Sequence, residues 1–172
     1  MTIEVIDNFL PDHDFKLLTD VLLGTEFPWY FNDQVVDDGI SKDNRFQFTH
    51  CILSAQGLYP CPDKEQYSNW YPLFEQLLSK LKVQGLLRIK INLNTRTFEH
   101  EKSKYHIDIS DIAGSKTAIY YLNTNNGWTR FKKGDKVNSV ANRMVIFDSN
   151  LEHSGVTCTN EQRRVVVNLN YV

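Results

Sequence analysis

An unbroken alternation of polar and apolar residues over residues 88–94 is the feature that most constrains the fold. Alternation with a period of two is typical of a β-strand with two different faces. The apolar face carries Ile89, Ile91 and Leu93, and the polar face carries Arg88, Lys90, Asn92 and Asn94. On an open sheet the polar face would meet solvent, whereas in a barrel it would line a cavity.

The remaining patterns predict helices in the first half of the chain and many short strands in the second. Apolar residues at helical spacing, with stop signals after them, predict two helices, at residues 11–22 and 70–81. Short alternating or β-branched runs between turn signals predict strands at residues 3–6, 28–31, 45–53, 117–123, 128–131, 136–140, 143–147 and 164–172. We therefore expect one α+β domain, mainly β, spanning residues 1–172, with a strand-rich barrel or sandwich and helices packed outside it.

Composition excludes several classes of function. The net charge of −2 and the absence of a basic, aromatic-interleaved patch give no reason to expect nucleic-acid binding. No run of 18 apolar residues and no signal-peptide pattern occurs, so we expect a soluble, cytoplasmic protein. The cysteines, Cys51, Cys61 and Cys158, fit no metal-binding spacing, and we expect three reduced thiols. The oligomeric state cannot be read from the sequence.

The chemistry-bearing residues lie in the second half of the chain. His106 and Asp108 are two residues apart, so that on a strand they would project to the same face. His153 follows 47 residues later, and Arg164 lies eleven residues beyond it, at the start of the final strand. Two histidines and one carboxylate form the ligand set of non-haem Fe(II) oxygenases. An arginine on a neighbouring strand can bind the far carboxylate of an anionic cosubstrate.

The order of these elements resembles the 2-oxoglutarate and Fe(II)-dependent dioxygenases, in particular their prolyl 4-hydroxylase-like branch. The pattern comprises His106-Ile107-Asp108, the Ala-Ile-Tyr-Tyr-Leu-Asn strand at 118–123, His153, and the basic pair Arg163-Arg164. The similarity covers residues 88–172, whereas the first half fits only loosely. The hairpin that begins at Gly127-Trp128 is more similar to compact phage-encoded members, which implies a host cytoplasm if the chain is phage-encoded.

The resemblance implies a fold, a ligand set and a cosubstrate. The fold would be a double-stranded β-helix, a cupin-like jelly-roll barrel with supporting N-terminal helices. His106, Asp108 and His153 would ligate Fe(II), and the reaction would consume 2-oxoglutarate and O₂, with ascorbate as reductant. The implied product is a hydroxylated C–H bond, with prolyl residues of a peptide or protein as one candidate substrate.

The cosubstrate residues are predicted with alternatives left open. Tyr121 matches the tyrosine that touches the distal carboxylate of 2-oxoglutarate, and Tyr120 then points to the opposite face. Strand register favours Arg164 over Arg163 as the basic residue that binds this carboxylate. Three asparagines are expected to line the same pocket, namely Asn92, Asn94 and Asn168.

Two other kinds of protein remain as alternatives. One is a non-catalytic binding module on the same barrel, and the other is an oxygenase of a small metabolite or free amino acid. A cupin isomerase is disfavoured, because the set of three histidines and a glutamate that those barrels usually present is not found. The polar segment 33–44, which contains Gly39, is a candidate lid over the site.

Overall fold

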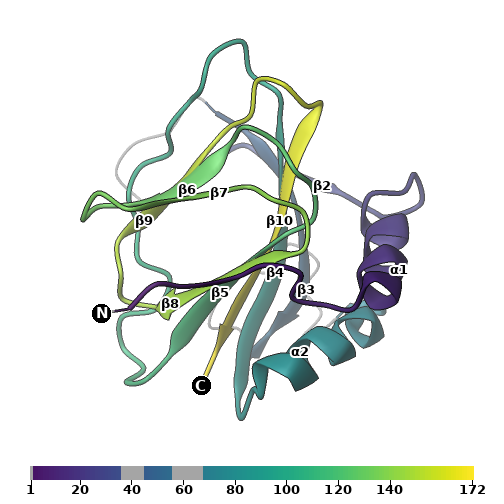
Figure 1. Cartoon of the computed structure of the whole chain (residues 1–172), viewed down its shortest axis with the longest axis vertical. Coiled ribbons are helices and arrows are strands. Elements are labelled where there is room, and N and C mark those ends of the chain that lie inside the picture. The colour runs from purple at the N-terminus through teal and green to yellow at the C-terminus, as the bar shows by residue number, and fades with distance from the viewer. Residues whose placement is uncertain (1, 36–44, 56–67) are drawn as a thin grey trace.

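A computed structural model describes residues 2–35, 45–55 and 68–172 of the chain. The described part contains ten strands, two α-helices and one 3₁₀ turn (Figure 1). The strands are β1 (Glu4–Ile6), β2 (Tyr30–Asn32), β3 (Gln47–Ser54), β4 (Leu86–Thr95), β5 (Lys116–Tyr121), β6 (Trp128–Phe131), β7 (Lys136–Asn138), β8 (Arg143–Asp148), β9 (His153–Val156) and β10 (Arg163–Tyr171). The helices are α1 (Asp12–Leu22), η2 (Tyr71–Phe74) and α2 (Glu75–Leu81).

The strands form two antiparallel sheets that face one another. The large sheet has the order β1-β8-β5-β10-β4-β3-β2, and the small sheet has the order β7-β6-β9. Strands β2, β3 and β4 are consecutive both in the chain and in the sheet, whereas β10 at the end of the chain pairs with both β4 and β5. This arrangement is a mainly β, jelly-roll-like sandwich, as predicted.

The helices cover the outer face of the large sheet (Figure 1). The apolar residues of β4, Ile89, Ile91 and Leu93, share a core with Leu18 and Leu22 of α1 and with Leu77 of α2. A second, smaller core contains Ile119 and Val166 of the large sheet together with Phe131 of the small one. Alternation along each central strand therefore divides its side chains between the helix-covered core and the space between the sheets.

Most predicted elements are present within two or three residues of the expected bounds. The N-terminal part of the second predicted helix is a 3₁₀ turn with Pro72 near its start, and Lys82 ends α2 in a left-handed conformation, with φ of 54°. Strand β9 was not predicted, since His153 was expected to follow a strand rather than to begin one. Most of the predicted lid at 33–44 lies outside the described residues. Within the described ranges, no helix is long and apolar enough to cross a membrane.

Candidate metal and cosubstrate site

A cavity of about 840 Å³ lies between the two sheets and is lined by most of the predicted site residues. Its walls include His106, Asp108 and His153 on one side and Arg164 on another. The polar face of β4 contributes Arg88, Lys90, Asn92 and Asn94. The alternation in β4 therefore corresponds to a cavity-lining strand and not to a solvent-exposed one.

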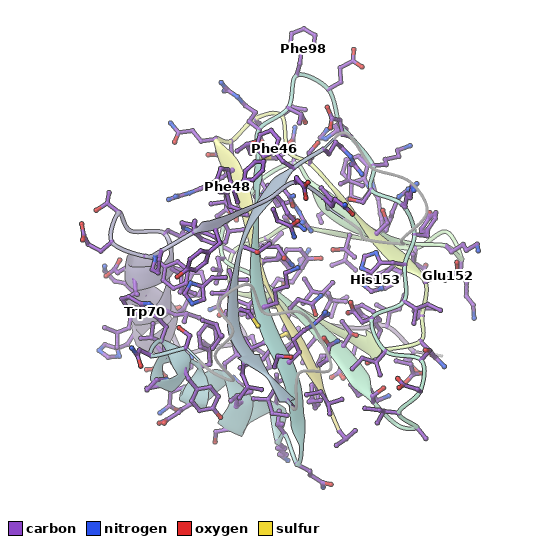
Figure 2. The ribbon with its side chains drawn as sticks, turned by 180° about the vertical axis from the view of Figure 1, so that it is seen from behind. Phe46, Phe48, Trp70, Phe98, Glu152 and His153 are labelled. Carbon is purple, nitrogen blue, oxygen red and sulfur yellow. The ribbon has the colours of Figure 1, made fainter. Side chains whose placement is uncertain are left out.

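The two histidines are joined through their backbones. The amide of His106 donates to the carbonyl oxygen of His153, and the amide of His153 donates to that of His106, both at 3.0 Å. This pair is an isolated bridge, so residues 105–108 do not lie on a regular strand. The bridge nevertheless places the two imidazole rings 4.5 Å apart between centroids. Figure 2 shows His153 beside Glu152, the residue just before β9.

The donor atoms of the three residues converge. His106 Nε2 lies 3.8 Å from Asp108 Oδ1, and His153 Nε2 lies 3.7 Å from Asp108 Oδ2. One ligand atom from each residue lies within 4.8 Å of the others. Two imidazole nitrogens and one carboxylate oxygen at this separation could hold one divalent transition-metal ion.

The protonation states also suit metal binding. His153 Nδ1 lies 2.9 Å from the carbonyl oxygen of Leu151, which can only accept, so Nδ1 carries the proton and Nε2 presents its lone pair to the site. Burial, followed by the neighbouring His153, lowers the pKa of His106 and keeps that imidazole neutral at pH 7. Both rings can therefore act as neutral nitrogen ligands.

Asp108 is held by side chains from three strands of the large sheet. Arg88 donates to its Oδ1 at 3.1 Å, and Thr117 and Asn170 donate to its Oδ2 at 2.9 and 3.2 Å. Burial alone would raise the pKa of Asp108, but Arg88 and the two imidazoles offset it, and the pKa lies below its usual range. The carboxylate is therefore ionised and fixed in orientation before any ligand binds.

Arg164 forms a separate cationic centre in the same cavity. It is only 3% exposed, and its guanidinium donates to the neutral oxygens Ser139 Oγ at 2.9 Å and Thr129 Oγ1 at 3.1 Å. Among the described residues, no carboxylate forms an ion pair with it. Burial lowers the pKa of Arg164, although guanidinium remains charged at any physiological pH. A buried, uncompensated guanidinium is suited to a carboxylate of a bound ligand.

Tyr121 and the three asparagines lie close to these centres in different ways. The ring of Tyr121 is 5.5 Å from the Arg164 guanidinium carbon, and its hydroxyl donates to Thr129 Oγ1 at 2.8 Å. Tyr121 is fully buried behind the cavity wall, whereas Asn92, Asn94 and Asn168 line the cavity. Side-chain oxygens of Asn92 and Asn168 are buried without a hydrogen-bond partner, so both are available to a ligand.

Arg163 and Tyr120, which precede Arg164 and Tyr121 in the sequence, point away from the cavity. Arg163 donates to the carbonyl oxygen of Leu23 at 2.6 Å, on the helix side of the sheet. The hydroxyl of Tyr120 donates to Asn142 Oδ1 at 2.5 Å, also away from the cavity. The geometry therefore separates Arg164 from Arg163 and Tyr121 from Tyr120 in the directions that alternation predicts.

The other histidines lie outside the donor cluster. His50 is buried, with one ring nitrogen bonded to the carbonyl oxygen of Pro28 and the other to Ser68 Oγ, so it has no free lone pair for a metal. His13 and His100 are exposed. The prediction of three reduced thiols is wrong for Cys51, which is disulfide-bonded, whereas Cys158 is a buried free thiol. Cys61 lies outside the described residues.

The sequence analysis assigned no role to several side chains of the candidate site. Arg88 and Lys90 were placed on the polar face of β4 but given no role, and Thr129 and Ser139 of the Arg164 centre were not recognised. The signal for the first two was present, because a cation on a cavity-lining face is costly unless something pairs with it. The hydroxyls had no comparable signal in the sequence.

No family model and no curated protein matches the sequence. The fold, in contrast, is similar to solved structures of 2-oxoglutarate and Fe(II) oxygenases. A prolyl hydroxylase from Trichoplax adhaerens, solved with a peptide fragment of the hypoxia inducible factor oxygen degradation domain, aligns over 98% of this chain and 82% of its own, with a TM-score of 0.65 and 16% identity. A Pseudomonas putida prolyl-4-hydroxylase aligns over 98% of this chain and 91% of its own, with a TM-score of 0.61 and 16% identity.

A third similar structure was solved with ligands. HygX from Streptomyces hygroscopicus, with nickel and 2-oxoglutarate bound, aligns over 98% of this chain and 82% of its own, with a TM-score of 0.57 and 12% identity. At these identities the likeness shows the fold. The chain thus has the jelly-roll-like fold of the 2-oxoglutarate and Fe(II) oxygenases, prolyl hydroxylases among them, and it carries a candidate His-Asp-His metal site.

Proposed function

We propose that the chain is a non-haem Fe(II) and 2-oxoglutarate-dependent dioxygenase that hydroxylates an unactivated C–H bond. The observation that carries the proposal is that one cavity contains both a cluster of metal donors and a buried guanidinium. The donors belong to His106, Asp108 and His153, and the guanidinium is that of Arg164, which forms no ion pair with a described carboxylate. A metal site alone would fit many proteins. A metal site that shares a cavity with a buried cation fits a cosubstrate that bridges the two.

The donor set fits Fe(II). His106 and His153 would provide neutral nitrogens, and Asp108 would provide the single charged oxygen, which leaves a net positive charge at the metal. Arg88, Thr117 and Asn170 hold the carboxylate in place, so little reorganisation is needed when the ion binds. Bound iron, together with 2-oxoglutarate and O₂, would supply the oxidising power, and 2-oxoglutarate would be converted to succinate and CO₂.

The protein's own part is to orient the cosubstrate and to exclude water. Arg164, backed by Thr129, Ser139 and the ring of Tyr121, would bind the distal carboxylate of 2-oxoglutarate. Asn92, Asn94 and Asn168 would contact the rest of the molecule, and the buried side-chain oxygens of Asn92 and Asn168 have no hydrogen-bond partner among the described residues.

Two substrate classes follow from this proposal. Prolyl residues of a peptide are one, by analogy with the prolyl hydroxylases of similar fold. A free amino acid or another small metabolite is the other, and a cavity of about 840 Å³ has room for such a molecule beside 2-oxoglutarate. A non-catalytic binding module on the same barrel is the alternative function that the experiment must exclude.

Succinate formation is the first measurement. Purified protein with Fe(II), ascorbate and 2-oxoglutarate should release succinate, whereas the H153A variant should not. Binding of 2-oxoglutarate to the Ni(II)-loaded protein should be lost in Arg164→Met and kept in Arg163→Met, because only the first side chain faces the cavity. Absence of both succinate and 2-oxoglutarate binding in the wild type would favour the binding module.

A further inference from the structure

Lys90 lies in the middle of the cavity wall, and the chemistry proposed above does not use it. It is on β4, on the same face as Arg88 and Asn92, and it lines the cavity. Its partner on β3 is Cys51, and its partner on β10 is Asn168, the residue whose amide lies 3.4 Å from Asp108. Lys90 is therefore beside the metal end of the cavity, displaced toward β3.

The ammonium group of Lys90 has no acidic partner among the described residues. The nearest carboxylate that acts on it is Asp108, which already forms its ion pair with Arg88 at 3.1 Å. Burial, followed by the positive charge of Arg88, lowers the pKa of Lys90 to about 8. Lys90 is thus a cation at neutral pH whose charge no described residue compensates. Its burial therefore lowers the free energy of unfolding.

An inventory of charges shows that the expected ligands do not compensate it either. Among the residues that the structure describes, three cations line the cavity, Arg88, Lys90 and Arg164, together with two carboxylates, Asp33 and Asp108. The metal ion would add two positive charges, and 2-oxoglutarate would add two negative ones. One positive charge remains, and since Asp33 is exposed at the rim, the excess is concentrated inside.

Position separates Lys90 from the carboxylate site at Arg164. Arg164 pairs with Asn94 on β4, four residues along the strand from Lys90. At a rise of about 3.3 Å per residue, the two backbone positions are about 13 Å apart. Lys90 instead pairs with Asn168, whose side-chain amide lies 3.4 Å from Asp108 Oδ2, so it lies at the end of the cavity that holds the candidate metal donors.

We infer that Lys90 is a specificity-determining residue that binds a carboxylate on the substrate, so that the substrate class is a carboxylate-bearing compound such as an amino acid or a peptide with a free carboxyl group. The inference rests on the proposed function and narrows it. One carboxylate matches the single ammonium group of Lys90, which has no acidic partner among the described residues. The ion pair would also fix which C–H bond of the substrate is presented to the metal.

The test uses matched ligands that differ only in this charge. A set of N-acetyl amino acids and the corresponding N-acetyl amino amides is titrated into the Ni(II)- and 2-oxoglutarate-loaded protein, and binding is followed by calorimetry. The same pairs are then compared for succinate release with Fe(II). In the wild type, at least one acid should bind about 10- to 100-fold more tightly than its amide, which is the effect of one charge-assisted hydrogen bond in a buried site.

Three variants locate the effect. Lys90→Met should remove the preference for acid over amide, Lys90→Arg should restore it in large part, and Lys102→Met, which changes an exposed lysine, should leave it intact. The affinity for 2-oxoglutarate itself is measured first for each protein. It should be the same in the wild type and Lys90→Met, because Arg164 and the metal hold the cosubstrate.

The possible failures are distinguishable. If no acid is preferred over its amide, or if the preference survives in Lys90→Met, the inference is wrong while the proposed function stands. A parallel loss of 2-oxoglutarate affinity in Lys90→Met would assign Lys90 to the cosubstrate and would also overturn it. If the wild type does not bind 2-oxoglutarate, the proposed function fails, and the inference fails with it.

Discussion

His106 and His153, which are 47 residues apart in the sequence, exchange two backbone hydrogen bonds of 3.0 Å. The bridge ties the segment before Asp108 to the first residue of β9. Since the bridge uses only main-chain atoms, the side chain of either histidine can be removed while the two segments stay in place. Metal binding and folding are therefore separable by mutation at this site.

Replacement of His153 by alanine should abolish tight metal binding and leave the fold intact. The variant removes one of the three proposed ligands, and two protein ligands hold a divalent ion poorly. Titration with Ni(II) or Co(II), followed by calorimetry, measures the loss, and circular dichroism checks the fold. His13→Ala is the matched control, because His13 is exposed on α1. Equal metal affinity in both variants would exclude His153 as a ligand.

Arg88 should control metal affinity although it is not expected to bind the ion. Its contact with Asp108 Oδ1, and that of its Nε with Asn170 Oδ1 at 2.8 Å, fix the carboxylate. Loss of such an outer contact commonly weakens metal binding about 10- to 100-fold. Arg88→Met should show a decrease of this size in metal titrations. Lys132→Met breaks an exposed pair with Glu152 and should have no effect, so a similar decrease there would contradict the assignment.

Gly127 should be required for the position of Arg164. A Cβ at residue 127 would lie 2.8 Å from Arg164 Cδ and 2.8 Å from the carbonyl oxygen of Val156, so the arginine must shift. Gly127→Ala should weaken 2-oxoglutarate binding by up to about 100-fold, the effect of losing a charge-assisted hydrogen bond. In Gly155→Ala the new Cβ would meet Arg164 Nη1 at an ordinary 3.7 Å, so this variant should bind nearly normally. Equal affinities in the two variants would show that Arg164 tolerates the shift.

Local patterns were sufficient to predict the strands of the large sheet that line the cavity, although not β9 of the small sheet. The alternation in β4 separated the residues that face α1 and α2 from those that face the cavity, and the same rule distinguished Arg164 from Arg163. These are short-range properties, because the direction of a side chain on a strand depends only on its position. The pairing of Asp108 with Arg88 is different, since it depends on which strands are neighbours in the sheet.

Several of the unpredicted features depend on contacts between segments that are distant in the sequence. Thr129 and Ser139 reach Arg164 only because the small sheet folds over the large one. His106 and Asp108 face the same side although they do not lie on a regular strand, because a single bridge to His153 replaces a ladder of hydrogen bonds. Sequence patterns therefore predict the faces of strands better than the contacts between them.

Lys90 should destabilise the folded protein at neutral pH, and this destabilisation should decrease as the pH rises. Its pKa falls from 10.5 to about 8 on folding, because burial and Arg88 disfavour the charged form. Between these two values the unfolded chain binds more protons than the folded one, so the contribution of Lys90 to the free energy of unfolding rises with pH. The cost is present in full below pH 8 and is on the order of 1 to 3 kcal/mol.

The comparison of wild type with Lys90→Met isolates this effect, because all other titrating groups are common to both. In metal-free protein, urea unfolding at pH 7 should find the variant more stable, and the difference should shrink between pH 8 and 10.5. The groups that act on Lys90 are Arg88 and Asp108, which keep their charges over this range, and Cys51 across from it has no thiol to titrate. Lys102→Met should run parallel to the wild type. A constant difference between wild type and Lys90→Met across the range would mean that Lys90 keeps its ordinary pKa in the folded protein.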